Sequence, residues 1–262
     1  MIRVLLLTVV KEDLAGLQRT VRSISSQSYL NLHHFIINGG DDSITDKYLT
    51  ELASNESKVS FLTECDNGIY SAMNKWNRYP DNFDLICWIN AGDIFESTET
   101  INRVVNSFCN SNWKWFYGNV RVVNYHGETK NEFFQIPFKR RLFELGLRWI
   151  PHGSVFMTYE ILGRVGKYRE DLGVGADQEF LFRVAKEAEP KTTTDIIFQL
   201  EDGGAHTTLK GLEREKNWHN FRYINKRLFL NSRILDFSIL PILLMLHKIQ
   251  FISRFPRNGR SN

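Results

Sequence analysis

The chain has 262 residues, 42% of them hydrophobic and 24% charged, a composition that supports one sizeable globular core and excludes a mainly disordered protein. The formal net charge is only +3, but residues 210–262 hold eleven of the Lys and Arg residues and three of the Asp and Glu residues. We therefore expect this basic tail to meet an anionic surface.

The cysteines and the first residues bear on the cellular compartment. Cys65, Cys87 and Cys109 are odd in number and lack C-x-x-C spacing, so the sequence indicates neither a disulfide framework nor a zinc knuckle. Met1 leads directly into an apolar run of strand length, without the basic leader and cleavage site of a signal peptide. We expect a protein of the reducing cytosol.

The first third of the chain alternates between expected strands and helices. Apolar runs predict strands at residues 3–10, 34–38, 59–62 and 85–89, and helical spacing of apolar residues predicts helices after the first three of them. Such alternation favours parallel strands, right-handed crossovers and a nucleotide-sized crevice at the strand ends. Neither a G-x-G-x-x-G nor a P-loop motif is present, which counts against NAD, FAD and P-loop NTPase functions.

The run at residues 85–89 ends abruptly in Asn90, Ala91, Gly92 and Asp93. A carboxylate placed beyond such a strand can reach a ligand in the crevice, although Asp93 can equally cap a following helix. Just before this strand, residues 66–76 read DNGIYSAMNKW, and the spacing of their apolar residues predicts a loop that opens into a helix.

The second half is less regular. We expect a strand at residues 115–124, a basic and aromatic acceptor-side loop with short helical turns at 128–149, and a strand at 193–200 that ends in EDGGAH. Apolar residues at helical spacing after position 179 place Asp177 and Glu179 at the amino end of a helix. The helix dipole favours a carboxylate at that position.

These motifs, in this order, resemble the family 2 glycosyltransferases of bacterial polysaccharide synthesis, including the O-antigen and colanic-acid types. That family shows D-x-G-I-Y-D-A-M-N-K-G, a strand ending N-S-D-D, H-Q-x-x-F, a-a-D-y-e-l-l-l-R and G-G-V-S. The resemblance implies a GT-A fold, with a mixed, mainly parallel sheet flanked by helices. It also implies a glycosyltransferase domain at residues 1–209, with a nucleotide-binding half (1–96) and an acceptor half (97–209), followed by a helical extension at 210–262.

The resemblance further implies an inverting hexosyl- or N-acetylhexosaminyltransferase that uses a nucleotide sugar, expected to be a UDP-sugar. Asp177 would be the base that deprotonates the acceptor, with Glu179 as a fallback base. His152 and Glu179 would line the acceptor pocket. Asp93 would bind Mg²⁺ or Mn²⁺, with His206 as a further metal ligand. Gly92 departs from the family pattern because it removes an acidic side chain.

Donor binding is expected at the strand ends and in the signature segment. Asn38 stands where the family commonly has Asp, which leaves the nucleotide base open. The expected donor-binding residues are Thr8, Val9, Val10, Asn38, Asp66, Asn74, Lys75, Ala91, Gly92 and Asp93.

The tail differs from the rest of the chain. Residues 234–252 are strongly apolar, but only 237–246 are free of charge, and Pro241 interrupts them, so a membrane-spanning helix is not expected. The surrounding basic residues favour a membrane-associating amphipathic segment. The alternatives are a buried helix and a dimer-forming helix, and only the second would make the protein a homodimer.

These features together predict a cytoplasmic enzyme, peripheral on the inner face of the cytoplasmic membrane, that acts on a polyprenyl-diphosphate-linked saccharide. A second hypothesis is a non-catalytic sugar-nucleotide-binding or assembly protein of the same fold. Nucleic acid is not an expected partner, because the basic residues of the tail flank an aliphatic run and do not alternate with stacking aromatics.

Overall fold

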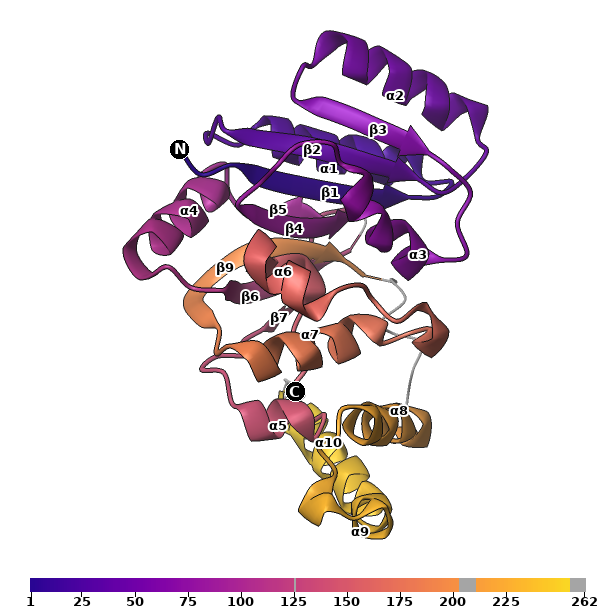
Figure 1. The fold of residues 1–262 in the computed structure, drawn as a ribbon, viewed down its shortest axis with the longest axis vertical. Helices are drawn as coiled ribbons and strands as arrows, with labels where there is room; N and C mark the ends of the chain where they lie inside the picture. Colours follow the sequence, from indigo (N-terminus) through magenta and orange to yellow (C-terminus); the bar gives the residue numbers. More distant parts are fainter. Residues whose placement is uncertain (125, 203–210, 255–262) are drawn as a thin grey trace, which may run out of the picture. The chain divides into compact units, whose positions relative to one another are not determined.

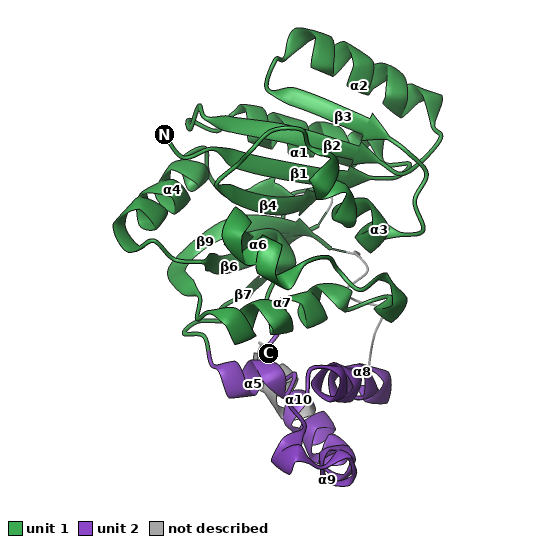
Figure 2. Ribbon diagram, viewed as in Figure 1, with its two compact units in different colours: residues 1–138, 150–204 green, residues 139–149, 205–262 purple. Residues whose placement is uncertain are grey.

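The computed structural model describes residues 1–124, 126–202 and 211–254, with side chains through residue 247. The chain divides into two compact units (Figure 2). The first unit comprises residues 1–138 and 150–204, and the C-terminal unit comprises residues 139–149 and 205–262. Residues 139–149, which the sequence analysis assigned to the acceptor half, thus belong with the tail.

The first unit begins with four parallel strands in the order β3-β2-β1-β4 (Figure 1). These strands are β1 (Val4–Val10), β2 (Leu32–Asn38), β3 (Val59–Thr63) and β4 (Leu85–Asn90). They are connected by helices α1 (Leu14–Ser25) and α2 (Ser43–Asn55), and by α3 (Ile69–Met73) with the 3₁₀ helix η1 (Asn74–Arg78). Each of the four strands predicted from apolar runs is present, and the signature segment opens into a helix as expected.

Local sequence explains where the first helices begin. The Asp13 carboxylate accepts a hydrogen bond from the Gly16 N–H at 2.8 Å, and Asp42 caps α2 through the N–H groups of Ile44 and Thr45. Each cap satisfies amide groups that have no partner within the helix.

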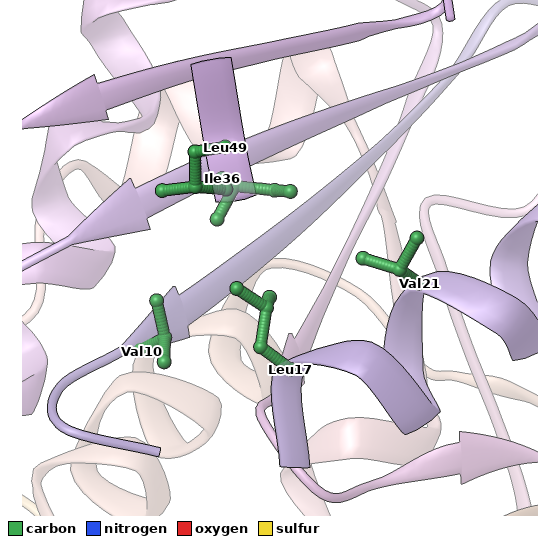
Figure 3. Close-up of a cluster of buried hydrophobic side chains, with 5 residues drawn as sticks. All are labelled: Val10, Leu17, Val21, Ile36 and Leu49. Carbon is green, nitrogen blue, oxygen red and sulfur yellow. The ribbon is translucent and has the colours of Figure 1, made fainter. Parts of the chain in front are cut away.

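Both helices then pack on the sheet through one apolar cluster (Figure 3). Its members come from β1, β2, α1 and α2, and are Val10, Leu17, Val21, Ile36 and Leu49. All five are at most 5% exposed. Complete burial of each such side chain contributes about 1.5–3 kcal/mol.

The other half of the sheet is mostly antiparallel, so the expectation of a mainly parallel sheet is correct only for the first half. β8 (Val155–Thr158) pairs antiparallel with both β4 and β6 (Trp115–Val123). β6 pairs parallel with β9 (Lys191–Glu201), whereas β7 (Thr129–Phe133) and β5 (Ile94–Phe95) join as antiparallel edge strands. Together the described strands form one mixed sheet of nine.

The helices and short turns of this half connect its strands. They are α4 (Thr100–Ser111), η2 (His152–Ser154), α6 (Tyr159–Val165), η3 (Glu170–Leu172) and α7 (Ala176–Glu187). Because α7 begins at Ala176, Asp177 lies in its first turn, as the spacing of apolar residues predicts.

The C-terminal unit consists of helices. They are α5 (Arg140–Glu144), α8 (Gly211–Ile224), the 3₁₀ helix η5 (Phe229–Asn231), α9 (Arg233–Ser238) and α10 (Leu240–Arg254). The expected acceptor-side loop at 128–149 contains a short helix, as predicted, but its first part forms strand β7, which was not predicted. The leucines after α5 begins pack with the tail. Leu147 joins Leu240 and Leu243 in a buried cluster. Gly146 has a φ of +76° and lies against Trp218, where a Cβ would come within 2.5 Å of the indole ring.

A buried ion cluster organises the turn between α8 and α9. The Asp236 carboxylate is fully buried and accepts hydrogen bonds from Arg222 Nε and Nη2, both at 2.8 Å, and from the Phe229 N–H at 2.8 Å. His219 Nδ1 lies 2.6 Å from the same carboxylate. These bonds lower the pKa of Asp236, against the effect of burial.

The apolar part of the tail is divided, because α9 ends at Ser238 and α10 begins at Leu240 with Pro241 in its first turn. Within the residues that the structure describes, no helix combines the length and the apolar character needed to span a bilayer. The tail is helical, as expected, but part of α10 is buried in the unit's own core.

Candidate active site

The strand ends of the first unit bring several of the expected residues to one edge of the sheet. Val10 pairs in register with Asn38, and Val9 pairs with Asn90. Beyond the strands, the Gly39 N–H donates to the Val10 carbonyl at 2.9 Å, and the Ala91 N–H donates to the Val9 carbonyl at 3.2 Å. The carboxyl ends of β1, β2 and β4 therefore meet, as the alternating pattern predicts.

Asp66, the first residue of the signature segment, lies against this edge. Its Oδ1 accepts a hydrogen bond from the Gly68 N–H at 2.9 Å. Its Oδ2 lies 1.7 Å from the position that a Cβ at Gly39 would occupy. Position 39 therefore has to be glycine for the Asp66 carboxylate to approach the end of β2.

Thr8 and Asn38 are fully buried, and the fold itself uses their polar groups. The Thr8 hydroxyl lies 2.8 Å from His34 Nε2. Asn38 Nδ2 donates to Asp46 Oδ1 at 3.0 Å, and its Oδ1 accepts from the Gly40 N–H at 3.2 Å. The structure thus places both side chains inside the fold, where they support the strand ends, and not at the accessible edge.

Asn74 and Lys75 are also buried and tie loops together. Asn74 accepts from the Tyr168 N–H at 2.8 Å and donates to the Tyr168 carbonyl at 3.0 Å. Lys75 Nζ donates to the Glu64 carbonyl at 2.7 Å, just before Asp66. The expected contact between Lys75 and a diphosphate has no support in this arrangement, because the ammonium group already holds the loop before the signature segment.

Asp93 lies in the turn between β4 and β5 and is 7% exposed. The Thr20 hydroxyl donates to its carbonyl at 2.7 Å and accepts from the Gly92 N–H at 3.1 Å, which fixes the turn to α1. The Asp93 Oδ1 accepts from the Glu201 N–H at 3.1 Å. Burial, helped by the nearby Glu201 carboxylate and opposed by that hydrogen bond, raises the pKa of Asp93 to about 7.

Glu201, at the end of β9, brings a second carboxylate to this turn. Its Oε2 lies 2.6 Å from the position that a Cβ at Gly92 would occupy, and Gly92 has a φ of +97°. The same oxygen is ion-paired with Arg19 from α1. Asp93, Glu201 and Arg19 thus form one cluster of ionisable side chains, and the Glu201 carboxylate takes up the space beside Gly92.

Asp177 receives two hydrogen bonds. The Tyr70 hydroxyl of α3 donates to its Oδ1 at 3.1 Å, and Gln178 Nε2 donates to its Oδ2 at 3.1 Å. Burial, followed by the charge of Asp177, raises the pKa of Tyr70 well above its usual value, so the phenol remains a donor. The signature segment is therefore joined to Asp177, which lies 107 residues further along the chain.

An aromatic wall lies beside Asp177. The Tyr168 ring stacks on Phe180 at 4.1 Å between centroids and meets Trp88 edge to face at 5.5 Å. The Tyr168 hydroxyl lies 2.6 Å from His152 Nε2. Burial lowers the pKa of His152, although the charge of Asp177 acts in the opposite direction. A neutral imidazole beside the aromatic rings is thus favoured.

Glu179 is fully buried and accepts hydrogen bonds from Arg183 Nε at 3.1 Å through both carboxylate oxygens. An enclosed, ion-paired carboxylate is poorly suited to contact an acceptor or to take up its proton. Asp177 therefore remains the candidate base on this helix, whereas Glu179 forms a buried ion pair that stabilises the fold.

A model of the family described as Glycosyl transferase family 2 matches residues 6–166 of the chain. The chain belongs to glycosyl transferase family 2. It is 29% identical over 202 residues to an uncharacterized glycosyltransferase of Mycobacterium tuberculosis, a match that covers 76% of this chain and 74% of the relative.

Solved structures show the same fold for this family 2 glycosyltransferase. S. aureus TarS in complex with UDP-GlcNAc is similar with a TM-score of 0.68 and 13% identity, over 98% of this chain and 75% of that one. The mannosyltransferase PcManGT from Pyrobaculum calidifontis, in complex with GDP-Man and Mn²⁺, gives a TM-score of 0.64 at 14% identity, over 98% and 76% of the two chains. The protein thus has a mixed α/β, GT-A-like fold.

The residues around Asp93 in this family 2 glycosyltransferase fit a divalent cation. Asp93 and Glu201 offer hard oxygen donors, and Mg²⁺ is commonly held by one or two carboxylates together with substrate phosphates. Burial, the largest cause of the raised pKa of Asp93, disfavours its ionised form, and a bound cation would favour that form. Among the described residues, no three His, Cys, Asp or Glu side chains converge as a ready metal cage.

His206, the other expected metal ligand, lies outside the described residues. Three residues that contact the candidate site residues were not singled out from the sequence: Tyr70, Tyr168 and Glu201. Tyr70 is part of the signature segment itself, and Glu201 directly follows the predicted strand at 193–200, so both positions carried a usable signal. The contact of Tyr168 with His152 could not be anticipated, because it depends on the tether at Asn74.

Proposed function

We propose that this protein is an inverting glycosyltransferase that moves a hexosyl or N-acetylhexosaminyl group from a nucleoside diphosphate, with UDP as the first choice, to a lipid-linked saccharide. The main support is the position of Asp177. It is partly exposed, lies in the first turn of α7 and is oriented by hydrogen bonds from Tyr70 and Gln178.

Asp177 acts as the base in this proposal. Its carboxylate accepts the proton of the acceptor hydroxyl as that oxygen attacks the anomeric carbon opposite the departing diphosphate. The Tyr70 and Gln178 donors hold one orientation of the carboxylate, and the wall of Trp88, Tyr168 and Phe180 limits access of water from its side. Inversion at the anomeric carbon follows from a single attack.

The donor binds at the strand ends in this proposal. The backbone at the ends of Val9 and Val10, together with Asp66 and Ala91, borders the base and ribose, while the Val10 side chain stays in the buried cluster. Asp93 is adjacent to the diphosphate. Asp93 and Glu201 would hold Mg²⁺ or Mn²⁺, which would neutralise the charge that develops on the leaving diphosphate. Such a cation would also stabilise Asp93 in its ionised form.

A lipid-linked acceptor is supported by the surface of the C-terminal unit. Among the side chains of this unit that the structure describes, the most exposed large apolar ones are Ile234 at 81%, Leu230 at 72%, Met245 at 62%, Ile242 at 59% and Phe237 at 55%. Ile234 and Phe237 also border an open hollow of about 390 Å³ together with His219 and Arg233. Apolar and basic groups side by side suit a phospholipid surface or a prenyl phosphate.

Replacement of Asp177 by Asn tests the proposed base. We expect turnover of a panel of UDP- and GDP-sugars, measured as released nucleoside diphosphate, to fall by about 100-fold to 10,000-fold. Donor affinity, measured by calorimetry, should stay within about threefold, because the amide keeps the shape of the side chain.

The matched control for this test is Asp171→Asn, at a carboxylate that is 65% exposed on the nearby turn η3. Its turnover should equal that of the wild type. If Asp177→Asn retained full turnover, the proposed role of Asp177 would be wrong.

The second candidate is a sugar-nucleotide-binding or assembly protein without catalysis. It is favoured by Gly92, which lacks the acidic side chain of the family pattern. Tight binding of a nucleotide sugar by the wild type, with neither transfer nor slow donor hydrolysis in the presence of Mg²⁺ or Mn²⁺, would decide for this candidate.

A further inference from the structure

Position 92 is the clearest departure of this chain from the family pattern, and the structure shows what occupies the space. The Glu201 carboxylate reaches within 2.6 Å of the point where a side chain at Gly92 would begin. Glu201 belongs to β9, which is distant from position 92 in sequence but lies next to β5 in the sheet.

We infer that Glu201 supplies the second carboxylate beside Asp93 that position 92 lacks, and that a divalent cation bound with the donor replaces Arg19 as its main counter-charge. This inference rests on the proposed function. In this inference Glu201 helps to bind the donor through the cation, a role that the motifs did not indicate. Arg19 neutralises the Glu201 carboxylate when no cation is bound.

Contacts of the Glu201 side chain and backbone support the first part, in which Glu201 supplies the second carboxylate beside Asp93. The Glu201 carboxylate occupies the space beside Gly92: a Cβ at position 92 would lie 2.6 Å from Oε2, so a side chain there would displace the carboxylate, and the φ of +97° also favours glycine. The Glu201 N–H also donates to Asp93 Oδ1, so one residue fixes the orientation of the first carboxylate and delivers the second. Oxygen donors of this kind suit Mg²⁺ and Mn²⁺.

The charges around the Asp93 turn support the second part, in which a cation replaces Arg19 as the counter-charge of Glu201. Two carboxylates lie in a turn whose Asp93 is almost completely buried, and Arg19 pairs with the Glu201 carboxylate. The Glu201 and Arg19 side chains are themselves only 26% and 29% exposed. Such an enclosed pair of carboxylates requires a nearby positive charge, which Arg19 supplies at Glu201.

Binding of Mn²⁺ tests the inference without measuring transfer. Mn²⁺ is titrated into the full-length protein saturated with UDP, and the free ion is followed by electron paramagnetic resonance. We expect Glu201→Gln to weaken Mn²⁺ binding by about tenfold or more, the usual effect of losing a ligand or its supporting partner. Glu201→Asp, which keeps the charge, should recover part of this loss.

Glu96→Gln is the matched control. Glu96 is also an arginine-paired carboxylate, 20% exposed, and its side chain bonds to Arg121 and Gln199 and not to Asp93 or Glu201. Its loss should change Mn²⁺ affinity by less than about twofold, while the melting temperatures of both variants report on folding. Arg19→Gln should bind Mn²⁺ at least as tightly as the wild type, whereas a purely structural pair would make this variant bind more weakly.

Wild-type affinity for Mn²⁺ in a folded Glu201→Gln variant would overturn the inference, as would a wild type that binds UDP but no Mn²⁺. The proposed function fails by a different result, namely absence of turnover with every donor. A wild type that transfers sugar, together with an unaffected Glu201→Gln variant, would therefore reject only the role of Glu201.

Discussion

Single residues at the strand ends show how the fold constrains the site. Thr8 was expected beside the nucleotide, but its hydroxyl lies 2.8 Å from Nε2 of His34, and both side chains are buried in the sheet. Burial lowers the pKa of His34 from its ordinary value of 6.5 to about 3. The imidazole is therefore neutral in the folded protein at every pH at which the enzyme would work.

This buried histidine predicts a dependence of stability on pH. Below pH 6.5 the unfolded chain takes up a proton at His34 and the folded chain does not, so the free energy of unfolding falls as the pH decreases towards 3. The loss is about 1.4 kcal/mol per pH unit, or about 2 kcal/mol between pH 6.5 and 5.0.

Urea unfolding of the wild type and of His34→Gln at both pH values measures the effect. The variant should be less stable at neutral pH, since it changes a packed side chain, but its loss between the two pH values should be smaller by about 2 kcal/mol. Equal losses in both proteins would contradict the buried neutral state.

At the scale of elements, the signature segment is a connector. Tyr70 of α3 reaches Asp177, Asn74 holds both backbone groups of Tyr168, and Trp88 of β4 donates to the Met73 carbonyl at 3.3 Å. A short helix thus links β4, the loop before η3 and the first turn of α7. The bonds of Asn74 to Tyr168 and of Lys75 to the Glu64 carbonyl give both buried side chains a structural role at the end of the segment.

Asn74→Ala should lower the free energy of unfolding by about 1–3 kcal/mol, because it leaves the buried N–H and carbonyl groups of Tyr168 without their partner. Turnover should fall with it, since Tyr168 borders His152. Asn55→Ala is the control, as Asn55 makes a comparable hydrogen bond on the exposed end of α2. Urea unfolding should show a change of at most about 0.5 kcal/mol in the control, and an equal change in both variants would deny the connector role.

The sequence predicted those strands whose buried residues form a clear apolar run. The central strands β1 and β4 are buried almost throughout and read as apolar runs, and β2 is buried over its last five residues, whereas the edge strand β3 is only half-buried but still has a short apolar run. β5 has two residues, and β7 reads TKNEF with no buried residue, so neither gives a periodic pattern. The antiparallel β8 is short and joins two strands distant in sequence, a pairing that only the tertiary fold decides.

The site was predictable to the same extent. Asp93 follows a strand with a strong pattern and Asp177 begins a helix with one, whereas the approach of Glu201 to Gly92 depends on β9 pairing with β5. The buried ion pair of Glu179 was missed for a similar reason, because helical spacing does not show which polar side chain a neighbouring loop will enclose.

At the scale of the whole molecule, charge and apolar exposure are unevenly distributed. Residues 210–262 contain eleven basic and three acidic residues, and the same segment carries most of the strongly exposed apolar side chains. The Asp236 carboxylate of α9 accepts a hydrogen bond from the Phe229 N–H of η5, and the next residue, Leu230, is 72% exposed with a φ of +51°. We propose that these exposed apolar side chains, which Lys226, Arg227 and Arg233 flank in the sequence, bind an anionic bilayer better than a neutral one.

Vesicle binding by the 262-residue chain should therefore depend both on the exposed apolar side chains and on the basic residues of the C-terminal unit. We expect sedimentation with phosphatidylglycerol-containing vesicles at low salt, weaker binding at 0.5 M salt, and little binding to phosphatidylcholine alone. The double variant Ile234→Ser, Phe237→Ser should lose at least about tenfold in affinity, because burial of each apolar side chain contributes about 1.5–3 kcal/mol. Leu30→Ser, Ile44→Ser is the control, since these side chains are 70% and 65% exposed in the first unit, and it should bind as the wild type does. If light scattering instead found a dimer that the double variant of the tail dissociates, the surface would serve a second copy of the chain, and the membrane proposal would be wrong.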